Sequence, residues 1–119
     1  MKYMLLIATD PTDAPMPNAD NAYDMSADYY AFTQAIVASG EMVAGDPLHD
    51  VSTATTVRIR DGVKSVTDGP YAETKEQLGG YYIVDVATLD RAIEIAADIP
   101  GAKIGSIEVR PIMEMTAEV

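Results

Sequence analysis

The sequence predicts an α+β fold: a ferredoxin-like βαββαβ core with an extra hairpin inserted in its middle. Short apolar segments typical of strands alternate with two segments of helical periodicity. The pair Asp61-Gly62, between two alternating segments, is a strong hairpin signal. The length of 119 residues suits one domain, expected to span residues 1–119 and to bury roughly two thirds of the unfolded surface.

The first elements are a strand and a helix separated by a long loop. Residues 2–8 are almost entirely apolar and end at Thr-Asp-Pro, which predicts a buried strand. Residues 9–25 contain three prolines and four aspartates and exceed the usual connection length. This loop is interpreted either as a mobile surface loop or as a lid over a site. Ser26 then caps a helix that ends at Gly40. The apolar face of this helix consists of Tyr29, Phe32, Thr33 and Ile36.

Three strands are predicted in the middle of the chain. The first spans residues 41–45 and ends at Asp46-Pro47, and the other two, 54–60 and 63–67, form the hairpin. A two-residue turn at Asp61-Gly62 pairs Thr55 with Asp68 and Val57 with Val66. Because opposed residues share a face, this register places Asp68 on the apolar face of the hairpin.

A strand, a helix and a final strand complete the fold. The strands cover residues 80–86 and 105–112, and the helix between them is capped by Thr88 and ended by Pro100-Gly101. The predicted buried stripe of this helix consists of Leu89, Ala92, Ile93, Ala96 and Ala97.

The strands at 2–8 and 80–86 are apolar on both faces, which requires cover on both faces of the sheet. In the predicted plan both helices lie on one face. A second copy most simply covers the other, so we expect a face-to-face homodimer.

The composition excludes several classes of function. Lys and Arg number 8 against 19 Asp and Glu, a net charge of −11, which disfavours nucleic acid and anionic membranes as partners. There is no Cys, which removes disulfides, thiolate metal sites and Cys nucleophiles. The single His, His49, cannot build a multi-His metal site and is interpreted as a surface residue. We expect a cytoplasmic protein without a cofactor. A weak Mg²⁺ or Ca²⁺ site among the aspartates of loop 9–25 remains open.

Residues 66–80 form the segment that is the strongest candidate for a functional site, because ionisable side chains gather there between Gly-Pro and Gly-Gly. Asp68, Glu73 and Lys75 are the candidate catalytic residues, since partial burial tunes such groups for acid–base work. Two other interpretations remain open. Asp68 caps the Gly69-Pro70 turn, or the charged residues form a solvated loop with surface ion pairs.

Four further residues are candidates for ligand binding: Arg58, Tyr71, Glu76 and Arg110. An arginine on a sheet face binds a carboxylate through two hydrogen bonds, which suits a small anionic ligand. The alternative is that Arg58 and Arg110 pair with Glu108 or another acid of the chain.

Several stretches resemble the DGPF domain family of the YCII-related superfamily. The most specific is Asp68-Gly69-Pro70-Tyr71-Ala72-Glu73-Thr74-Lys75-Glu76, where Tyr71 stands in place of Phe. The opening residues 1–7, the segment 54–62 and the closing residues 107–112 are similar to the family as well. The resemblance implies a dimeric α+β barrel. It also implies an association of some members with extracytoplasmic-function sigma factors. A His–Asp pair proposed in the superfamily has an early His, and this chain has no His before His49.

Two hypotheses follow. The first is a small-molecule-binding protein or enzyme with an acid–base pocket near residues 66–80. The second is a non-catalytic interaction or regulatory module, in which the same segment is a structural clasp or a partner surface. A concave pocket lined by Asp68, Glu73 and Lys75 favours the first hypothesis, and mutual pairing of these residues on an open surface favours the second.

Overall fold

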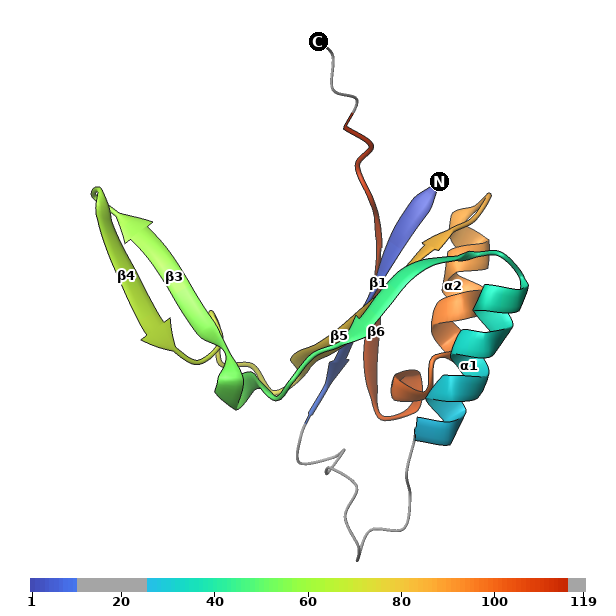
Figure 1. Cartoon of the computed structure of the whole chain (residues 1–119), viewed down its shortest axis with the longest axis horizontal. Helices are drawn as coiled ribbons and strands as arrows, with labels where there is room; N and C mark the ends of the chain where they lie inside the picture. The colour runs from blue at the N-terminus through green and yellow to red at the C-terminus, as the bar shows by residue number, and fades with distance from the viewer. Residues whose placement is uncertain (11–25, 116–119) are drawn as a thin grey trace, which may run out of the picture.

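The structure, a computed structural model that describes residues 1–10 and 26–115, consists of a sheet, a helical layer and a projecting hairpin (Figure 1). Its strands are β1 (Lys2–Thr9), β2 (Met42–Pro47), β3 (Thr55–Arg60), β4 (Val63–Asp68), β5 (Gln77–Asp85) and β6 (Gly105–Pro111). Its helices are α1 (Ser26–Ala38) and α2 (Leu89–Asp98), with short 3-10 helices η1 (Val51–Thr53) and η2 (Pro100–Lys103).

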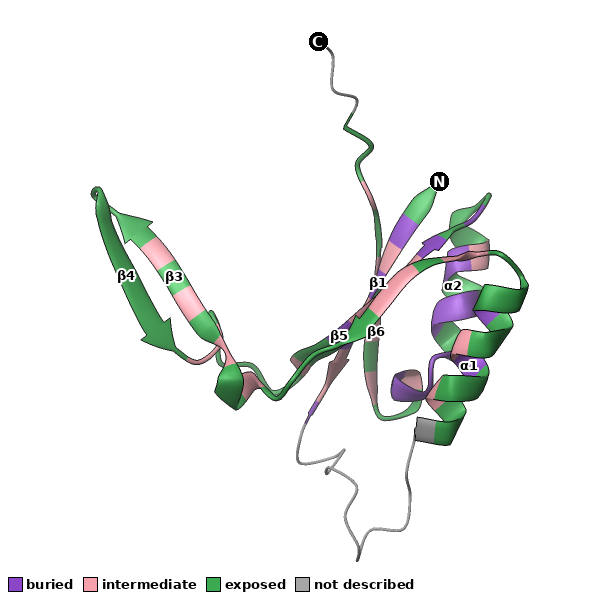
Figure 2. Ribbon diagram, in the orientation of Figure 1, coloured by how far each residue is buried: buried purple, intermediate pink, exposed green. Residues whose placement is uncertain are grey.

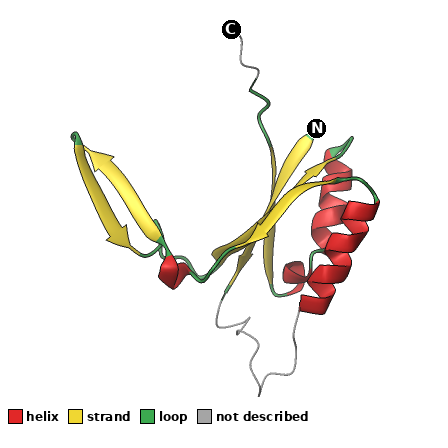
Figure 3. Ribbon diagram, viewed as in Figure 1, coloured by secondary structure: helices red, strands yellow, loops and turns green. Residues whose placement is uncertain are grey.

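The main sheet has the strand order β2-β5-β1-β6, and every neighbouring pair is antiparallel. Without the hairpin, this is the strand order of a ferredoxin-like fold, so the predicted fold class is confirmed. Both helices lie on the same side of the sheet, as Figure 3 shows. The other side, which we call the open face, is covered by none of the described helices.

The core lies between the sheet and the two helices. Tyr3, Leu5 and Ile7 alternate along β1 and are buried, and they meet Phe32 and Ile36 of α1 (Figure 2). The rings of Phe32 and Tyr82 pack edge to face with centroids 5.0 Å apart. The Tyr82 hydroxyl lies 2.9 Å from Thr33 Oγ1, which satisfies both hydroxyl groups at the margin of the core. The predicted apolar face of the first helix is therefore confirmed.

The predicted stripe of the second helix is wrong in part. Ala92 and Ala96 are buried as expected, but Leu89 and Ile93 are about half exposed and Ala97 is exposed. Ile95 is buried in their place. The predicted stripe and the observed one share two alanines. The bulky Ile95 and Ile99, four residues apart, decide which side of α2 faces the core because they bury the most apolar surface.

Two strand boundaries differ from the prediction by more than one residue. Asp46 and Pro47 lie inside β2, although Asp-Pro reads as a strand end. β2 is an edge strand, where a proline needs no partner for its missing N–H. β5 begins at Gln77 rather than at Gly80, and Gly80 pairs with Pro47. A side chain at Gly80 would come within 3.1 Å of the Asp46 carbonyl oxygen, so glycine here serves the close approach of two strands.

The hairpin of β3 and β4, which we call the arm (residues 55–68), forms a separate two-stranded sheet. Asp61 and Gly62 at its tip have φ values of 53° and 76°, as a two-residue hairpin turn requires. The predicted register is confirmed, including Val57 opposite Val66 and Thr55 opposite Asp68. Figure 1 shows the arm projecting well away from the main sheet and both helices.

Candidate functional site

The open face combines an apolar centre with polar edges. Since paired residues of an antiparallel sheet share a face, the register of β1 with its neighbours identifies the residues of the open face. Met4 pairs with Ile83, and Leu6 pairs with Tyr81, so these residues lie on the open face of the two central strands, β1 and β5. The edges are polar: Asp46 pairs with Tyr81 on one side, and on the other Arg110 and Glu108 pair with Met4 and Leu6. The arrangement offers an apolar floor between charged rims.

Two pairs of hydrogen-bonded side chains organise the polar edges of this face. The Tyr81 hydroxyl donates to Asp46 Oδ2 at 2.7 Å, and the hydrogen bond to this carboxylate raises the pKa of the Tyr81 hydroxyl above its usual value of 10.0. On the opposite edge, the Ser106 hydroxyl lies 2.8 and 3.1 Å from the two carboxylate oxygens of Glu76. Ser106 pairs with Ala8 of β1, so Glu76 is held over the β6 edge.

Two predicted ligand-binding residues, Glu76 and Arg110, therefore lie at the open face. The alternative that Arg110 pairs with Glu108 is not what the structure shows: within residues 1–10 and 26–115, neither side chain forms an ion pair. Both are exposed. A guanidinium and a carboxylate thus flank the apolar centre with their charges available.

The other two predicted ligand-binding residues, Arg58 and Tyr71, meet at the base of the arm. Arg58 Nη2 donates to the Tyr71 carbonyl oxygen at 2.9 Å, and in the described part of the chain Arg58 forms no ion pair with an acid. Thr56 Oγ1 donates to the Gly69 carbonyl oxygen at 2.7 Å, and the Gly69 N–H donates to Ala54. Gly69 has a φ of 104°, which only glycine adopts readily. These bonds fasten the Gly-Pro-Tyr turn to β3, and the Tyr71 side chain remains 81% exposed.

The candidate catalytic residues are all exposed. Asp68 ends β4 on the apolar face of the arm, as its register predicted. Glu73 and Lys75 lie in the connection to β5. In the described part of the chain, none of the three forms an ion pair. One chain therefore assembles these residues neither into a pocket nor into a paired surface cluster.

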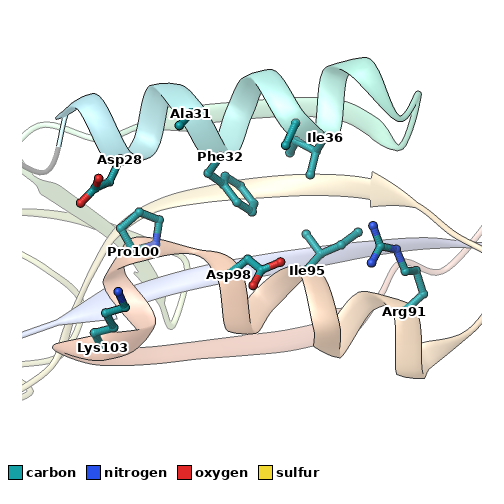
Figure 4. A pocket seen from close by; sticks show the side chains of 10 residues that line it. Asp28, Ala31, Phe32, Ile36, Arg91, Ile95, Asp98, Pro100 and Lys103 are labelled. Atoms are coloured by element: carbon teal, nitrogen blue, oxygen red, sulfur yellow. The ribbon is translucent and has the colours of Figure 1, made fainter.

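The structure also contains a groove of about 470 Å³ between α1 and α2, which none of the predicted site residues lines (Figure 4). Its apolar lining includes Phe32, Ile36 and Ile95. Arg91 stands at one end, where Glu41 and Glu94 already neutralise its charge, and Lys103 stands near the other end. Its lining residues come from two segments, 28–36 and 91–103, and form no known motif, so sequence reasoning missed this groove.

Sequence reasoning also missed four residues of the open face: Asp46, Tyr81, Ser106 and Glu108. The available signal was the alternating direction of side chains along strands 80–86 and 105–112, which places Tyr81 and Glu108 on the face opposite the helices. Among the residues that the structure describes, no three His, Asp or Glu side chains gather in a way that could hold a metal ion. The aspartates of loop 9–25, apart from Asp10, lie outside the described residues, as does the interpretation of that loop as a lid. No described helix is long and apolar enough to cross a membrane.

Fold and site together define a small ferredoxin-like α+β protein with a partly apolar sheet face that no described helix covers. Residues 1–116 match the YCII-related domain, and the chain belongs to this family. An uncharacterised protein of Rhizobium meliloti (strain 1021) is 35% identical over 114 residues, which cover 94% of this chain and 92% of the relative.

Proposed function

We propose that the protein binds a small organic anion on the open face of the sheet and acts on it as an enzyme or presents it as a binding protein. The observation that carries this proposal is the Arg110 guanidinium, exposed and without an acidic partner in the described chain, beside an apolar floor of Met4, Leu6 and Ile83. A carboxylate would bind Arg110 while the apolar part of the ligand covers the floor.

In this proposal Glu76 is a second polar contact beside Arg110 and accepts a hydrogen bond from the ligand, because Ser106 fixes its carboxylate at the edge of the open face. Asp68, Glu73 and Lys75 supply acid–base groups from the neighbouring segment, and Tyr71 forms a wall. Arg58 positions this wall through the Tyr71 carbonyl group. The run from Asp68 to Gly80 supports a more specific proposal, that the chain belongs to the DGPF branch of its family.

The test is a thermal-shift screen of the purified protein against small carboxylates, aromatic acids, phosphates and divalent metals, followed by calorimetry. A ligand that binds the folded state raises the Tm by mass action. We expect a saturable shift with a carboxylate, which Arg110→Met abolishes. Arg60→Met is the matched control, because Arg60 is an exposed arginine near the arm tip that, among the described residues, bonds only to the Ile59 carbonyl oxygen. An equal loss of the ligand-induced rise in Tm in both variants, or no rise in Tm with any compound, would contradict the proposal.

The second candidate is a non-catalytic interaction or regulatory module, and the association of similar proteins with extracytoplasmic-function sigma factors suggests one partner. The observation that favours it is the clasp at the base of the arm, in which Thr56 and Arg58 bind the carbonyl groups of the Gly69–Tyr71 turn. It predicts a flat ligand screen together with an Asp68→Ala variant of lowered Tm. The first proposal instead predicts an Asp68→Ala variant of unchanged Tm that alters turnover or ligand binding.

A further inference from the structure

The β6 edge of the open face carries two acidic groups and one basic group in a row. Ser106, Glu108 and Arg110 occupy every second position of β6, so all three side chains point to the open face. The Ser106 hydroxyl donates to both carboxylate oxygens of Glu76. The order along this edge is therefore the Glu76 carboxylate, the Glu108 carboxylate and the Arg110 guanidinium, and neighbouring positions on the strand are about 7 Å apart.

These three charged groups do not neutralise one another. Among the described residues, Glu108 and Arg110 form no ion pair, and Glu76 accepts hydrogen bonds only from the neutral Ser106 hydroxyl. All three charged side chains are exposed. A ligand carboxylate bound to Arg110 lies beside the Glu108 carboxylate, and like charges at such short range repel. A ligand whose only charged group is a carboxylate therefore fits one half of this edge and not the other.

An ammonium group on the ligand complements the acidic half of the edge. It has three N–H donors, which the carboxylates of Glu76 and Glu108 can accept. In an α-amino acid the ammonium and carboxylate groups are attached to the same carbon atom. One such molecule therefore reaches both Glu108 and Arg110, which are two residues apart on β6. Hydrogen bonds between oppositely charged groups are roughly twice as strong as those between neutral groups, so this match favours binding at both ends.

The floor of the open face indicates the side chain of that amino acid. Arg110 pairs with Met4, and Met4 pairs with Ile83, so the apolar surface begins one strand spacing, about 4.8 Å, from the arginine. Met4, Leu6 and Ile83 are only partly buried, which leaves them accessible to a ligand. The far edge carries the Asp46 carboxylate, which repels a second acidic group. The floor therefore favours an apolar side chain over an acidic one.

We propose that the ligand of the open face is an α-amino acid with an apolar side chain. Its carboxylate binds Arg110, its ammonium group binds Glu108 and Glu76, and its side chain covers the apolar floor. This inference rests on the proposed function, since it narrows the carboxylate-bearing ligand to one that also bears an ammonium group. Because such a molecule has no net charge, the net charge of −11 on the chain does not oppose its approach.

The first test compares compounds that share one apolar body, by titration calorimetry. L-phenylalanine has both charged groups, 3-phenylpropanoate lacks the ammonium group, and 2-phenylethylamine lacks the carboxylate. We expect L-phenylalanine to bind at least ~10-fold more tightly than either of the other two, and L-leucine to exceed 4-methylpentanoate by a similar factor. Equal Kd values for each amino acid and its des-amino acid would overturn this inference and leave the proposed function standing. Binding of none of these compounds would also overturn it, and the wider carboxylate screen then decides on the proposed function.

The second test locates the ammonium group with Glu108→Gln. We expect this variant to raise the Kd of L-phenylalanine at least ~10-fold, but not that of 3-phenylpropanoate, because it removes an attraction for the first compound and a repulsion for the second. Glu94→Gln is the matched control, since Glu94 is an exposed glutamate of α2, on the helical side of the sheet. It should change either Kd less than ~2-fold, since solvent screens a distant exposed charge. Equal increases for both compounds in Glu108→Gln, with folding verified by circular dichroism, would overturn the assignment.

Discussion

Glu41 and Arg91 form the best-developed ion pair among the described residues. Arg91 donates to both carboxylate oxygens of Glu41 at 2.8 Å, and Ser39 donates to Glu41 as well. The Glu41 side chain is only 18% exposed. The hydrogen bonds from Arg91 and then from Ser39 lower the pKa of the Glu41 carboxyl group from 4.5 to about 2. The pair joins α2 to the chain between α1 and β2.

This lowered pKa predicts a pH-dependent contribution to stability. The folded state binds the Glu41 proton less tightly than the unfolded state does. The contribution is therefore complete above pH 4.5 and disappears as the pH falls toward 2. We expect Glu41→Gln to lower the Tm by about 4 °C at pH 7, with the difference from wild type shrinking below pH 4.5.

The control for this experiment is Glu94→Gln. Glu94 also contacts Arg91, but its side chain is 67% exposed, so we expect a smaller change in Tm. Thermal unfolding of the three proteins between pH 2.5 and pH 7 measures both effects. A difference in Tm between wild type and Glu41→Gln that stays constant over this pH range would contradict the lowered pKa of Glu41.

At the scale of the elements, the contact of β1 with β6 depends on a glycine. A Cβ atom at Gly105 would press into the Ala8 carbonyl oxygen and would lie 3.0 Å from Thr9 Cα. Both neighbours are backbone atoms, so no side-chain rotation relieves the overlap. We expect Gly105→Ala to lower the free energy of unfolding by about 2–3 kcal/mol, measured by urea denaturation.

Gly79 in β5 is the matched control for this change. A Cβ atom there meets nothing within 4 Å, so we expect Gly79→Ala to change the free energy of unfolding by less than about 1 kcal/mol. Equal destabilisation by the two substitutions would indicate a general loss of backbone freedom rather than crowding between β1 and β6.

Elements with a strong local signal could be predicted from the sequence. Asp61-Gly62 determined the register of the arm because only a two-residue turn suits that pair. Thr88 determined the start of α2, and its hydroxyl accepts the Arg91 N–H at 3.2 Å. The C-terminal end of β2 and the start of β5 could not be predicted, because the Pro and Gly residues there are locally typical of turns. Pairing between Pro47 and Gly80 keeps both within the sheet.

At the scale of the whole molecule, the acidic excess opposes the compact state. With 19 acidic and 8 basic residues, folding brings like charges together, and dissolved ions screen them within about 10 Å at 0.1 M salt. We expect the Tm to rise by a few degrees between about 20 and 200 mM NaCl. Scanning calorimetry at pH 7 measures this change, and a Tm that falls with salt would show that attractive ion pairs outweigh the repulsion.

The candidate site could be predicted only in part, because the sequence shows which side chains have suitable chemistry but does not show which of them lie close together in the folded chain. Glu76 and Arg110 lie at the open face. Asp68 is close in the sequence to Glu76, yet it lies on the arm, whereas Glu73 and Lys75 lie in the same connection between β4 and β5 as Glu76. The separation arises because the arm projects as its own sheet, which depends on contacts absent from residues 55–68 themselves.

The central position of β1 also has a consequence for how the protein is made. β1 leaves the ribosome before the other described strands, but its two neighbours are β5 and β6, at residues 77–85 and 105–111. Leu5 and Ile7 therefore have no sheet partners during most of translation. Such late, long-range pairing slows folding and leaves apolar segments open to aggregation. Overproduction at high synthesis rates should thus demand more chaperone assistance than the small size of the chain suggests.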